Sequence, residues 1–248
     1  MDNDDEKTYF GFEQIKKSHK KHRVGEVFRQ VSDQYDMFND VASLGVHRMW
    51  KAYTIWLMNL KEGHRVLDVA CGSGDLAYAE KQKVGLSGEV IMCDISDKML
   101  EKGRDRCLDK GCVIPAIKAD AEKLPFKSDQ FDRVSIAFGL RNVTDRLKAL
   151  QEFYRVTRKG GKLVILEFTD IDNRNLTGKL YDWYSFRVLP RIGELTVGNK
   201  YPYKYLVESI KKYPRPQSIS ELILEAGFSA ARFQKILPGV VTVHTASR

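Results

Sequence analysis

The chain has 248 residues, a length that suits one α/β domain or two small domains. Hydrophobic residues make up 43% of the sequence and charged residues 30%, values typical of globular proteins, which exclude disordered and fibrous chains. Lysine and arginine outnumber aspartate and glutamate by 41 to 33. The resulting net charge of +8 favours an anionic partner, such as nucleic acid, an anionic lipid surface or an acidic substrate.

Signals for targeting and for metal binding are missing from the sequence. No run of about 18 apolar residues predicts a transmembrane helix. The acidic start, Met1–Glu6, resembles neither a secretory signal nor a transit peptide, so a cytoplasmic location is expected. The four cysteines lack a paired or zinc-type spacing and the five histidines lack an HExxH-type pattern, which predicts free thiols and no metal site.

The N-terminal part divides into two predicted segments. Residues 1–22 are polar and run into the basic stretch Lys16–Arg23, which predicts a flexible basic arm. Residues 23–60 are predicted to form a helical cap, because apolar residues recur at helical spacing from Val24 to Val31 and again from Arg48 to Leu60.

Beyond Gly63, short runs rich in β-branched residues alternate with charged helical segments. This alternation predicts a parallel sheet covered by helices on both faces. The five predicted strands are Arg65–Ala70, Glu89–Asp94, Val113–Ala119, Phe131–Ala137 and Lys162–Phe168, with helices such as Asp97–Lys110 and Asp145–Arg158 between them.

The C-terminal part adds a helix and a hairpin. A capping box at Ser218–Glu221 predicts where the helix begins, and Gly227 predicts its end. Phe233–Leu237 and Val240–His244 predict an antiparallel hairpin that completes a seven-stranded, Rossmann-like α/β sheet whose last strand is antiparallel. Ahead of the helix, residues 170–217 form an aromatic-rich insertion that predicts a lid, with an extra packing layer as the alternative.

A glycine-rich loop, DVACGSGD, follows the first of these strands. Gly72 and Gly74 allow a tight turn and a close ligand approach, and Asp94 ends the next strand, where a carboxylate can accept both ribose hydroxyls. The same spacing fits the dinucleotide motif GxGxxA, so an NAD-binding dehydrogenase is a competing interpretation. Asp75 disfavours a pyrophosphate, whereas Asp68 suits a ligand that carries an ammonium and a sulfonium, which favours S-adenosylmethionine.

The ends of two further strands suit the adenine part of such a cofactor. Asp120 follows the third strand, where its carboxylate can accept a hydrogen bond from the exocyclic amine, although an ordinary turn acid is the alternative. Ile95 and Met99 can enclose the adenine ring between them.

Five segments carry a more specific resemblance. From about Phe10 to the C-terminus, the sequence resembles the C-methyltransferases of ubiquinone/menaquinone biosynthesis, within the class I S-adenosylmethionine-dependent methyltransferases. The segments are Phe28–Asp40, Ser43–Lys51, Val66–Asp75, Ala137–Thr144 (AFGLRNVT) and Tyr184–Gly193. The resemblance implies a methyltransferase domain over residues 23–248 that uses S-adenosyl-L-methionine. The implied reaction is C-methylation of a polyprenylated benzoquinol (2-methoxy-6-polyprenyl-1,4-benzoquinol), of demethylmenaquinol, or of both, with another small aromatic or lipid substrate as the alternative.

Carried over position by position, the resemblance implies that Ser73, Asp94, Asp120 and Ala121 contact the cofactor. The sequence departs from the family pattern at several positions: Cys71 stands where a glycine is usual, Ser73 where a threonine is usual and Ala137 where a serine is frequent, and the segment 158–161 lacks the usual proline. None of these departures removes a group that the chemistry needs.

Methylation of carbon needs an electron-rich ring carbon, which ionisation of a quinol hydroxyl supplies. Arg141, beyond the fourth strand, is expected to stabilise that phenolate or to orient a water or quinol hydroxyl, with Asn142 donating beside it. Tyr35 is a third catalytic candidate, with helix packing as its alternative role, and His47 is expected to be structural rather than a base. The residues expected to contact the substrate are Asn39, Tyr184 and Arg187.

The resemblance also bears on partners. The residues after the fourth strand lack the Asp/Asn-Pro-Pro-aromatic motif of base methylases, and no RNA-binding module is present, so no nucleic-acid partner is expected. A polyprenyl quinol lies in lipid, so the basic arm and Leu180–Pro190 are expected to meet an anionic membrane surface, peripherally at the inner face of the cytoplasmic membrane. Assembly as a homodimer, or as a cofactor-binding subunit of a quinone-biosynthesis complex, stays open.

Overall fold

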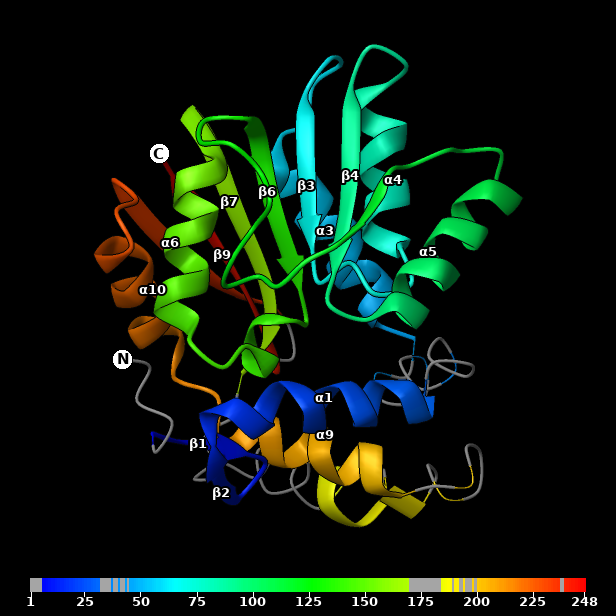
Figure 1. Cartoon of the computed structure of the whole chain (residues 1–248), viewed down its shortest axis with the longest axis vertical. Coiled ribbons are helices and arrows are strands. Elements are labelled where there is room, and N and C mark those ends of the chain that lie inside the picture. The colour runs from blue at the N-terminus through cyan, green and yellow to red at the C-terminus, as the bar shows by residue number, and fades with distance from the viewer. Residues whose placement is uncertain are drawn as a thin grey trace.

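The protein is seen in a computed structural model that describes residues 6–31, 37, 40, 43, 45–169, 184–188, 190, 191, 194, 198, 200–236 and 239–248. A seven-stranded sheet forms its centre, with the strand order β5-β4-β3-β6-β7-β9-β8 (Figure 1). The strands are β3 (Arg65–Val69), β4 (Glu89–Asp94), β5 (Ala116–Lys118), β6 (Phe131–Ala137), β7 (Thr157–Phe168), β8 (Ala230–Ile236) and β9 (Val241–Ser247).

The strand directions confirm the predicted Rossmann-like sheet. β3 pairs in parallel with β4 and β6, β5 extends the parallel set beside β4, and β7 extends it beside β6. β9, the last strand of the chain, runs antiparallel between β7 and β8. The carboxyl ends of the parallel strands therefore meet at one edge, which is where open α/β sheets bind ligands.

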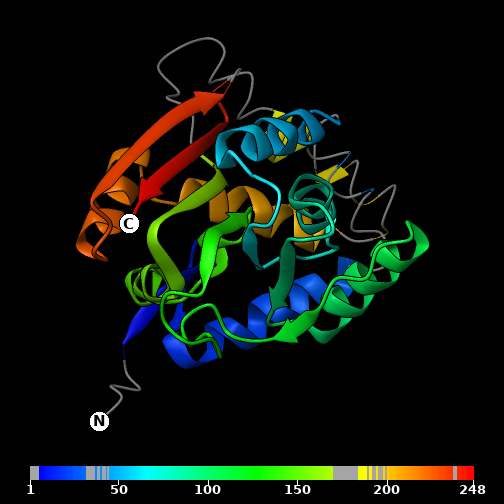
Figure 2. The ribbon, with the colours of Figure 1, turned by 90° about the horizontal axis from the view of Figure 1, so that it is seen from above.

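Helices cover both faces of the sheet (Figure 2). On one face lie α3 (His47–Met58), α4 (Asp75–Val84) and α5 (Asp97–Asp109), which share a buried core with Val66, Val90 and Val164. On the other face lie α6 (Arg146–Val156) and α10 (Pro216–Glu225), packed with Leu67 and Val134. Adjacent residues of β3 thus enter opposite cores, because successive side chains of a strand point to opposite faces.

The predicted helical cap is only partly correct. α3 does not cover the strand ends but packs on the face of the sheet, where Trp50, Ile55 and Met58 are buried. The spacing of apolar residues predicts that α3 is an amphipathic helix but not which surface it covers.

The predicted capping box is wrong. α10 begins at Pro216, and Arg215 at its N-cap makes no side-chain cap hydrogen bond. Proline suits the first helical position, because its fixed φ is already helical and its missing N–H would have had no partner in the helix. Ser218 therefore lies inside the helix, while Gly227 follows the C-terminal end with a φ of +113°, as expected.

A second layer lies beneath the carboxyl ends of the strands, and we call it the cover layer. It consists of the hairpin β1 (Lys7–Phe10) and β2 (Glu13–Lys16), the helices α1 (Lys17–Val31) and α9 (Tyr201–Lys211), and the short π-helix η3 (Tyr184–Val188). Figure 1 shows α1 and α9 packed together below the sheet. A small core of Phe10, Val24, Val27 and Tyr205 holds the layer together.

The flexible arm expected for residues 1–22 is therefore wrong over residues 6–22, while residues 1–5 lie outside the described part. The basic stretch continues from β2 into α1, whose apolar side chains join the cover-layer core. Lys20 is buried at 2% exposure, and its Nζ donates to the Val143 carbonyl at 3.1 Å. Desolvation lowers the pKa of Lys20 to about 8.

The predicted lid over residues 170–217 is described in part. Residues 170–183 and several positions between 189 and 199 lie outside the described residues. In the described part, Tyr203 and Tyr205 of α9 are buried, which agrees with the alternative of an extra packing layer for these two aromatics. No helix within the described ranges is long and apolar enough to cross a membrane.

Candidate active site

A cleft lies between the carboxyl ends of the strands and α1. It holds about 830 Å³ of empty space, its mouth included, which is within the range of small-molecule sites. Its walls come from the loop after β3, the ends of β4 and β6, the turn after β5, and the α1 face that carries Lys21, Val24 and Phe28.

Most of the predicted cofactor residues meet in this cleft. They come from three different strand ends and converge because the strands are parallel. Those that line the cleft are Gly72, Asp94, Ile95, Met99, Asp120 and Ala121.

Three predicted cofactor residues lie behind the wall rather than in it. Asp68 is 1% exposed on β3, and Ser73 is 2% exposed, with its Oγ 3.3 Å from Nη1 of Arg106. Gly74 faces α5, since a Cβ there would lie 3.2 Å from backbone atoms of Gly103. Gly74 is thus needed for the packing of α5 against the loop, and its φ of +74° also favours glycine.

Asp94 has the geometry of a ribose acceptor. Its Oδ2 accepts the Gly72 N–H at 3.0 Å and its Oδ1 accepts the Ser96 N–H at 2.9 Å, which fixes the carboxylate at the cleft wall. Burial raises the pKa of Asp94, and these N–H donors oppose that rise. A carboxylate has about four acceptor positions, so beside these backbone bonds Asp94 keeps capacity to accept a hydroxyl donor, as binding of a ribose needs.

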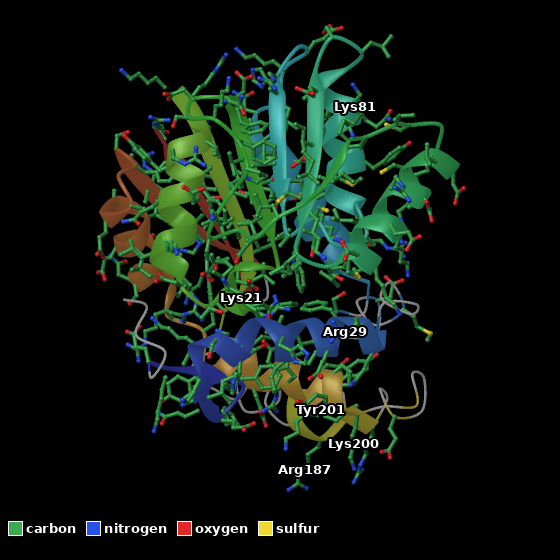
Figure 3. All side chains as sticks on the ribbon, in the orientation of Figure 1. Lys21, Arg29, Lys81, Arg187, Lys200 and Tyr201 are labelled. Carbon is green, nitrogen blue, oxygen red and sulfur yellow. The ribbon has the colours of Figure 1, made fainter. Side chains whose placement is uncertain are left out.

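The cleft carries an excess of negative charge. Asp94, Asp120 and Glu122 line it, and Lys21 is the one cation among the described lining residues. Nζ of Lys21 lies 2.5 Å from Asp120 and 3.0 Å from Glu122, so α1 is tied across the turn after β5. Figure 3 shows Lys21 between α1 and the edge of the sheet.

This charge distribution changes the case against a dinucleotide. Asp75 is neutralised by an ion pair with Arg106 and by Nζ of Lys51 at 3.2 Å, so it repels a pyrophosphate less than its position alone implies. The carboxylates that line the cleft disfavour a pyrophosphate more directly, because they repel an anionic ligand and attract one with positive groups.

A buried acidic pair lies beneath the glycine-rich loop. Ser135 Oγ lies 2.7 Å from Oε1 of Glu80 and 3.4 Å from Oδ1 of Asp68. Burial raises the pKa of Glu80 to about 7, and burial together with the charge of Glu80 raises the pKa of Asp68 well above its usual value. Two carboxyl groups this close and this buried favour holding a proton between them.

Arg141 is engaged with an acidic partner rather than directed into the cleft. Its Nη1 donates to Oε1 of Glu167 at 2.8 Å and to the Phe138 carbonyl, and its backbone N–H donates to Oε2 of Glu167 at 3.1 Å. Both side chains are buried, at 8% and 0% exposure. Glu167 went unrecognised in the sequence, although a lone charged residue in the run LVILEF is a signal for a buried ion pair.

Asn142 is the predicted catalytic residue that does line the cleft. It follows Arg141 in the short 3-10 helix η2 (Leu140–Asn142), just beyond β6. Its side-chain Oδ1 accepts a hydrogen bond from the Tyr205 hydroxyl at 3.0 Å. Lys21, which lines the cleft, and Tyr205, which contacts Asn142, were not predicted as site residues, because only tertiary packing brings α1 to the cleft and α9 to η2.

Three further described residues weighed for the site, Tyr184, Arg187 and His47, do not line the cleft. Tyr184 is half-buried and Arg187 is exposed on η3, and neither lines the cleft; Figure 3 places Arg187 on the side of the cover layer away from the sheet. His47 is buried, with Nδ1 2.8 Å from Oγ of Ser43, which agrees with a structural role. Tyr35 and Asn39 lie outside the described residues.

The sheet order and the acidic cleft at its switch point define a class I S-adenosylmethionine-dependent methyltransferase. The chain belongs to the ubiE/COQ5 methyltransferase family, whose model matches residues 16–248. It is 45% identical over 239 residues to the ubiquinone/menaquinone biosynthesis C-methyltransferase UbiE of Pseudomonas putida strain F1, covering 96% of this chain and 93% of that protein. The UbiE protein of Neisseria meningitidis serogroup A is also 45% identical, with 96% and 97% covered.

Solved structures support the fold. A SAM-dependent methyltransferase from Aquifex aeolicus matches with a TM-score of 0.59 and 18% identity, covering 79% of this chain and 88% of that one. The [4+2]-cyclase SpnF matches with a TM-score of 0.60 and 15% identity, covering 81% and 80%. Because a cyclase shares the architecture, the fold by itself does not decide the reaction.

Proposed function

We propose that this chain transfers a methyl group from S-adenosyl-L-methionine to a ring carbon of a polyprenylated benzoquinol (2-methoxy-6-polyprenyl-1,4-benzoquinol), of demethylmenaquinol, or of both. The observation that carries the proposal is the cleft in which Asp94 and Asp120 on one side meet Asn142 on another. Family membership supplies the reaction class, and the names of the UbiE relatives supply the quinol substrates.

The charge of the lining residues supports this cofactor. Asp94 would accept from the ribose hydroxyls and Asp120 from the adenine amine, with Ile95, Met99 and Ala121 against the ring. When bound, S-adenosylmethionine supplies a methyl group activated by a sulfonium. The lining carboxylates favour its positive groups, and the glycine-rich loop leaves room at Gly72.

The quinol half has to make a ring carbon nucleophilic. A phenol of pKa near 10 is about three units from neutral pH, so its ionisation costs roughly 4 kcal/mol. Asn142 can offset part of this cost by donating to the oxygen. Arg141 adds less than an unpaired arginine would, because Glu167 neutralises its charge, so its role is to hold η2 at the cleft.

A direct assay tests the reaction. Purified protein is incubated with methyl-labelled S-adenosylmethionine and with each demethylated quinol, and mass spectrometry locates the label. We expect label on a ring carbon of one or both quinols, while an absence of label from both would overturn the proposal. Saturating NADH should give no thermal shift and S-adenosylhomocysteine a clear one, which separates this function from a dehydrogenase.

The cofactor assignment has a matched test. Asp120→Asn should weaken binding of S-adenosylhomocysteine about tenfold, because a carboxylate acceptor is lost at the cleft wall. Asp109→Asn, at the exposed end of α5, should leave binding unchanged. Equal affinities for the two variants would contradict the assignment of Asp120.

The outer side of the cover layer suits contact with an anionic membrane. Figure 3 shows Arg187 and Lys200 on the side away from the sheet, where both are exposed, and Lys204, one turn beyond Lys200 in the chain, is exposed as well. Cations at such a surface contribute about 1 kcal/mol each with anionic lipid. The basic arm that was expected to make this contact is folded into α1, so these residues are proposed to make it instead. Whether the chain is a homodimer or works in a quinone-biosynthesis complex stays a prediction.

Vesicle sedimentation tests this surface. The wild type should sediment with phosphatidylglycerol vesicles, and the variant Arg187→Glu/Lys200→Glu/Lys204→Glu should stay in the supernatant. The control Lys83→Glu/Lys127→Glu/Lys159→Glu changes the same charge near the opposite ends of the strands and should still sediment with the vesicles. Equal sedimentation of the two variants would contradict the proposal.

A further inference from the structure

The two ends of the Asn142 amide have different surroundings. Oδ1 accepts the hydrogen bond from the Tyr205 hydroxyl, at 3.0 Å, while the side chain as a whole lines the cleft. Because Oδ1 is directed to the Tyr205 hydroxyl, the opposite end of the amide is Nδ2, which carries two donor hydrogens and no acceptor.

Tyr205 is itself held rigidly. It is 5% exposed on α9, and its ring stacks on Phe10 with centroids 4.3 Å apart and planes 23° apart. Val24 and Val27 of α1 complete its surroundings in the cover-layer core. Burial raises the pKa of Tyr205, so its hydroxyl keeps its proton and remains a donor.

We propose that Tyr205 is a positioning residue that fixes the amide of Asn142, so that Nδ2 faces the cleft and donates to the quinol oxygen on which negative charge builds during methyl transfer. The inference rests on the proposed function. An amide can turn about its terminal bond and exchange the places of its oxygen and nitrogen. The wrong orientation would present Oδ1 to a negatively charged oxygen, which raises the barrier instead of lowering it.

Arg141 cannot take over this task in the observed arrangement. Its Nη1 is bound to Glu167 and to the Phe138 carbonyl, and its side chain does not line the cleft. Asn142 is therefore the donor of η2 that reaches the ligand, and Tyr205 connects that donor to the cover layer. A residue of the aromatic insertion thereby becomes part of the catalytic arrangement without touching the substrate.

Tyr205→Phe tests the proposal, because it removes the hydroxyl and keeps the ring against Phe10. We expect kcat for quinol methylation to fall about tenfold. The Kd of S-adenosylhomocysteine and the unfolding temperature should stay close to the wild-type values. Tyr213→Phe is the matched control, since Tyr213 is buried at 6% exposure and its hydroxyl has no hydrogen-bond partner within the described chain. That variant should keep wild-type kcat.

A double-mutant cycle separates positioning from general packing. In an Asn142→Ala background, Tyr205→Phe should cause no further loss of kcat, because the group it positions is gone. Asn142→Asp keeps an oxygen that can accept the hydrogen bond from Tyr205 but loses the N–H donor. Its kcat should therefore fall.

The outcomes of these experiments distinguish a failure of the role of Tyr205 from a failure of the proposed function. If the wild type methylates a quinol and Tyr205→Phe has normal kcat, the inference is overturned. The same follows if Tyr205→Phe lowers kcat equally in the wild-type and Asn142→Ala backgrounds, since its effect would then not pass through Asn142. If the wild type labels neither quinol, the proposed function is overturned and the inference with it.

Discussion

Nη1 of Arg141 lies 2.8 Å from Oε1 of Glu167, and the two side chains form a buried ion pair that joins η2 to the end of β7. The same carboxylate accepts the backbone N–H groups of Arg141 and Phe168. The turn that carries Asn142 is therefore anchored to the strand beside it by one acidic side chain.

Glu167→Gln should be strongly destabilising, because it leaves the Arg141 charge buried without its counter-charge. Loss of one partner of a buried pair costs about 3–5 kcal/mol. Urea unfolding measures the effect. Glu89→Gln is the control, since its pair with Arg65 is about half exposed and should cost less than about 1 kcal/mol. Similar losses for both variants would show that the Arg141–Glu167 pair does not anchor η2.

Lys21→Met should tighten cofactor binding. The Lys21 ammonium occupies Asp120, the proposed acceptor for the adenine amine, and has to be displaced. The pair is partly exposed, so its loss should lower the Kd of S-adenosylhomocysteine by no more than about fivefold. Titration calorimetry measures the change, and the difference should shrink at high salt.

Lys17→Met provides the comparison for Lys21. Lys17 lies on the same helix and pairs with Glu6 at 2.6 Å, but it does not line the cleft. Its substitution should leave the Kd unchanged. Weaker binding by Lys21→Met would reverse the interpretation, because it would mean that the ion pair holds α1 over the bound cofactor.

Glu80 should make stability depend on pH between about 4.5 and 7. Its folded pKa, about 7, lies above the ordinary value of 4.5, so the folded chain binds more protons in this interval and stability falls as the pH rises. In Glu80→Gln, the decrease in the free energy of unfolding between pH 5 and pH 8 should be smaller by about 2–3 kcal/mol. Urea unfolding at pH 5 and pH 8 measures it, with Glu101→Gln on the exposed side of α5 as control. An unchanged pH dependence in Glu80→Gln would contradict the assignment.

The centre of the sheet was predictable from sequence because β3, β4 and β6 are buried along most of their length, unlike the edge strand β8. β4 and β6 match their predicted bounds. The interior of β4, VIMC, is a continuous apolar run, whereas β6 also buries Asp132, Arg133 and Ser135 among its apolar residues. β7 begins earlier than predicted, at Thr157, because its first residues shift register against β6. Local patterns do not reveal such a shift.

The site was predictable only where its residues follow strand ends. Gly72, Asp94 and Asp120 lie where the βα alternation requires. Lys21 lines the cleft from α1, and Tyr205 of α9 contacts the lining residue Asn142; these two helices lie far apart in sequence and meet through the cover-layer core. A charge run such as Lys16–Arg23 looks like a solvated arm until the partners of Lys20 and Lys21 are known.

Gly103→Ala should destabilise the protein, although alanine normally favours a helix. A Cβ at Gly103 would lie 3.0 Å from the Gly72 carbonyl oxygen and 3.2 Å from the Gly74 nitrogen, so α5 would have to move away from the glycine-rich loop. Because Gly72 lines the cleft, the Kd of S-adenosylhomocysteine should rise about tenfold as well, at a stability cost of about 1–3 kcal/mol.

The effect on stability should have the opposite sign at Gly25, a glycine inside helix α1. A Cβ at Gly25 of α1 meets nothing closer than Nη1 of Arg29 at 3.6 Å, so Gly25→Ala should stabilise the chain by about 0.5–1 kcal/mol. Urea unfolding of both variants compares them directly. If Gly103→Ala were as stabilising as Gly25→Ala, the close contact between α5 and the glycine-rich loop would not limit the fold, and the packing role assigned to Gly74 would fail with it.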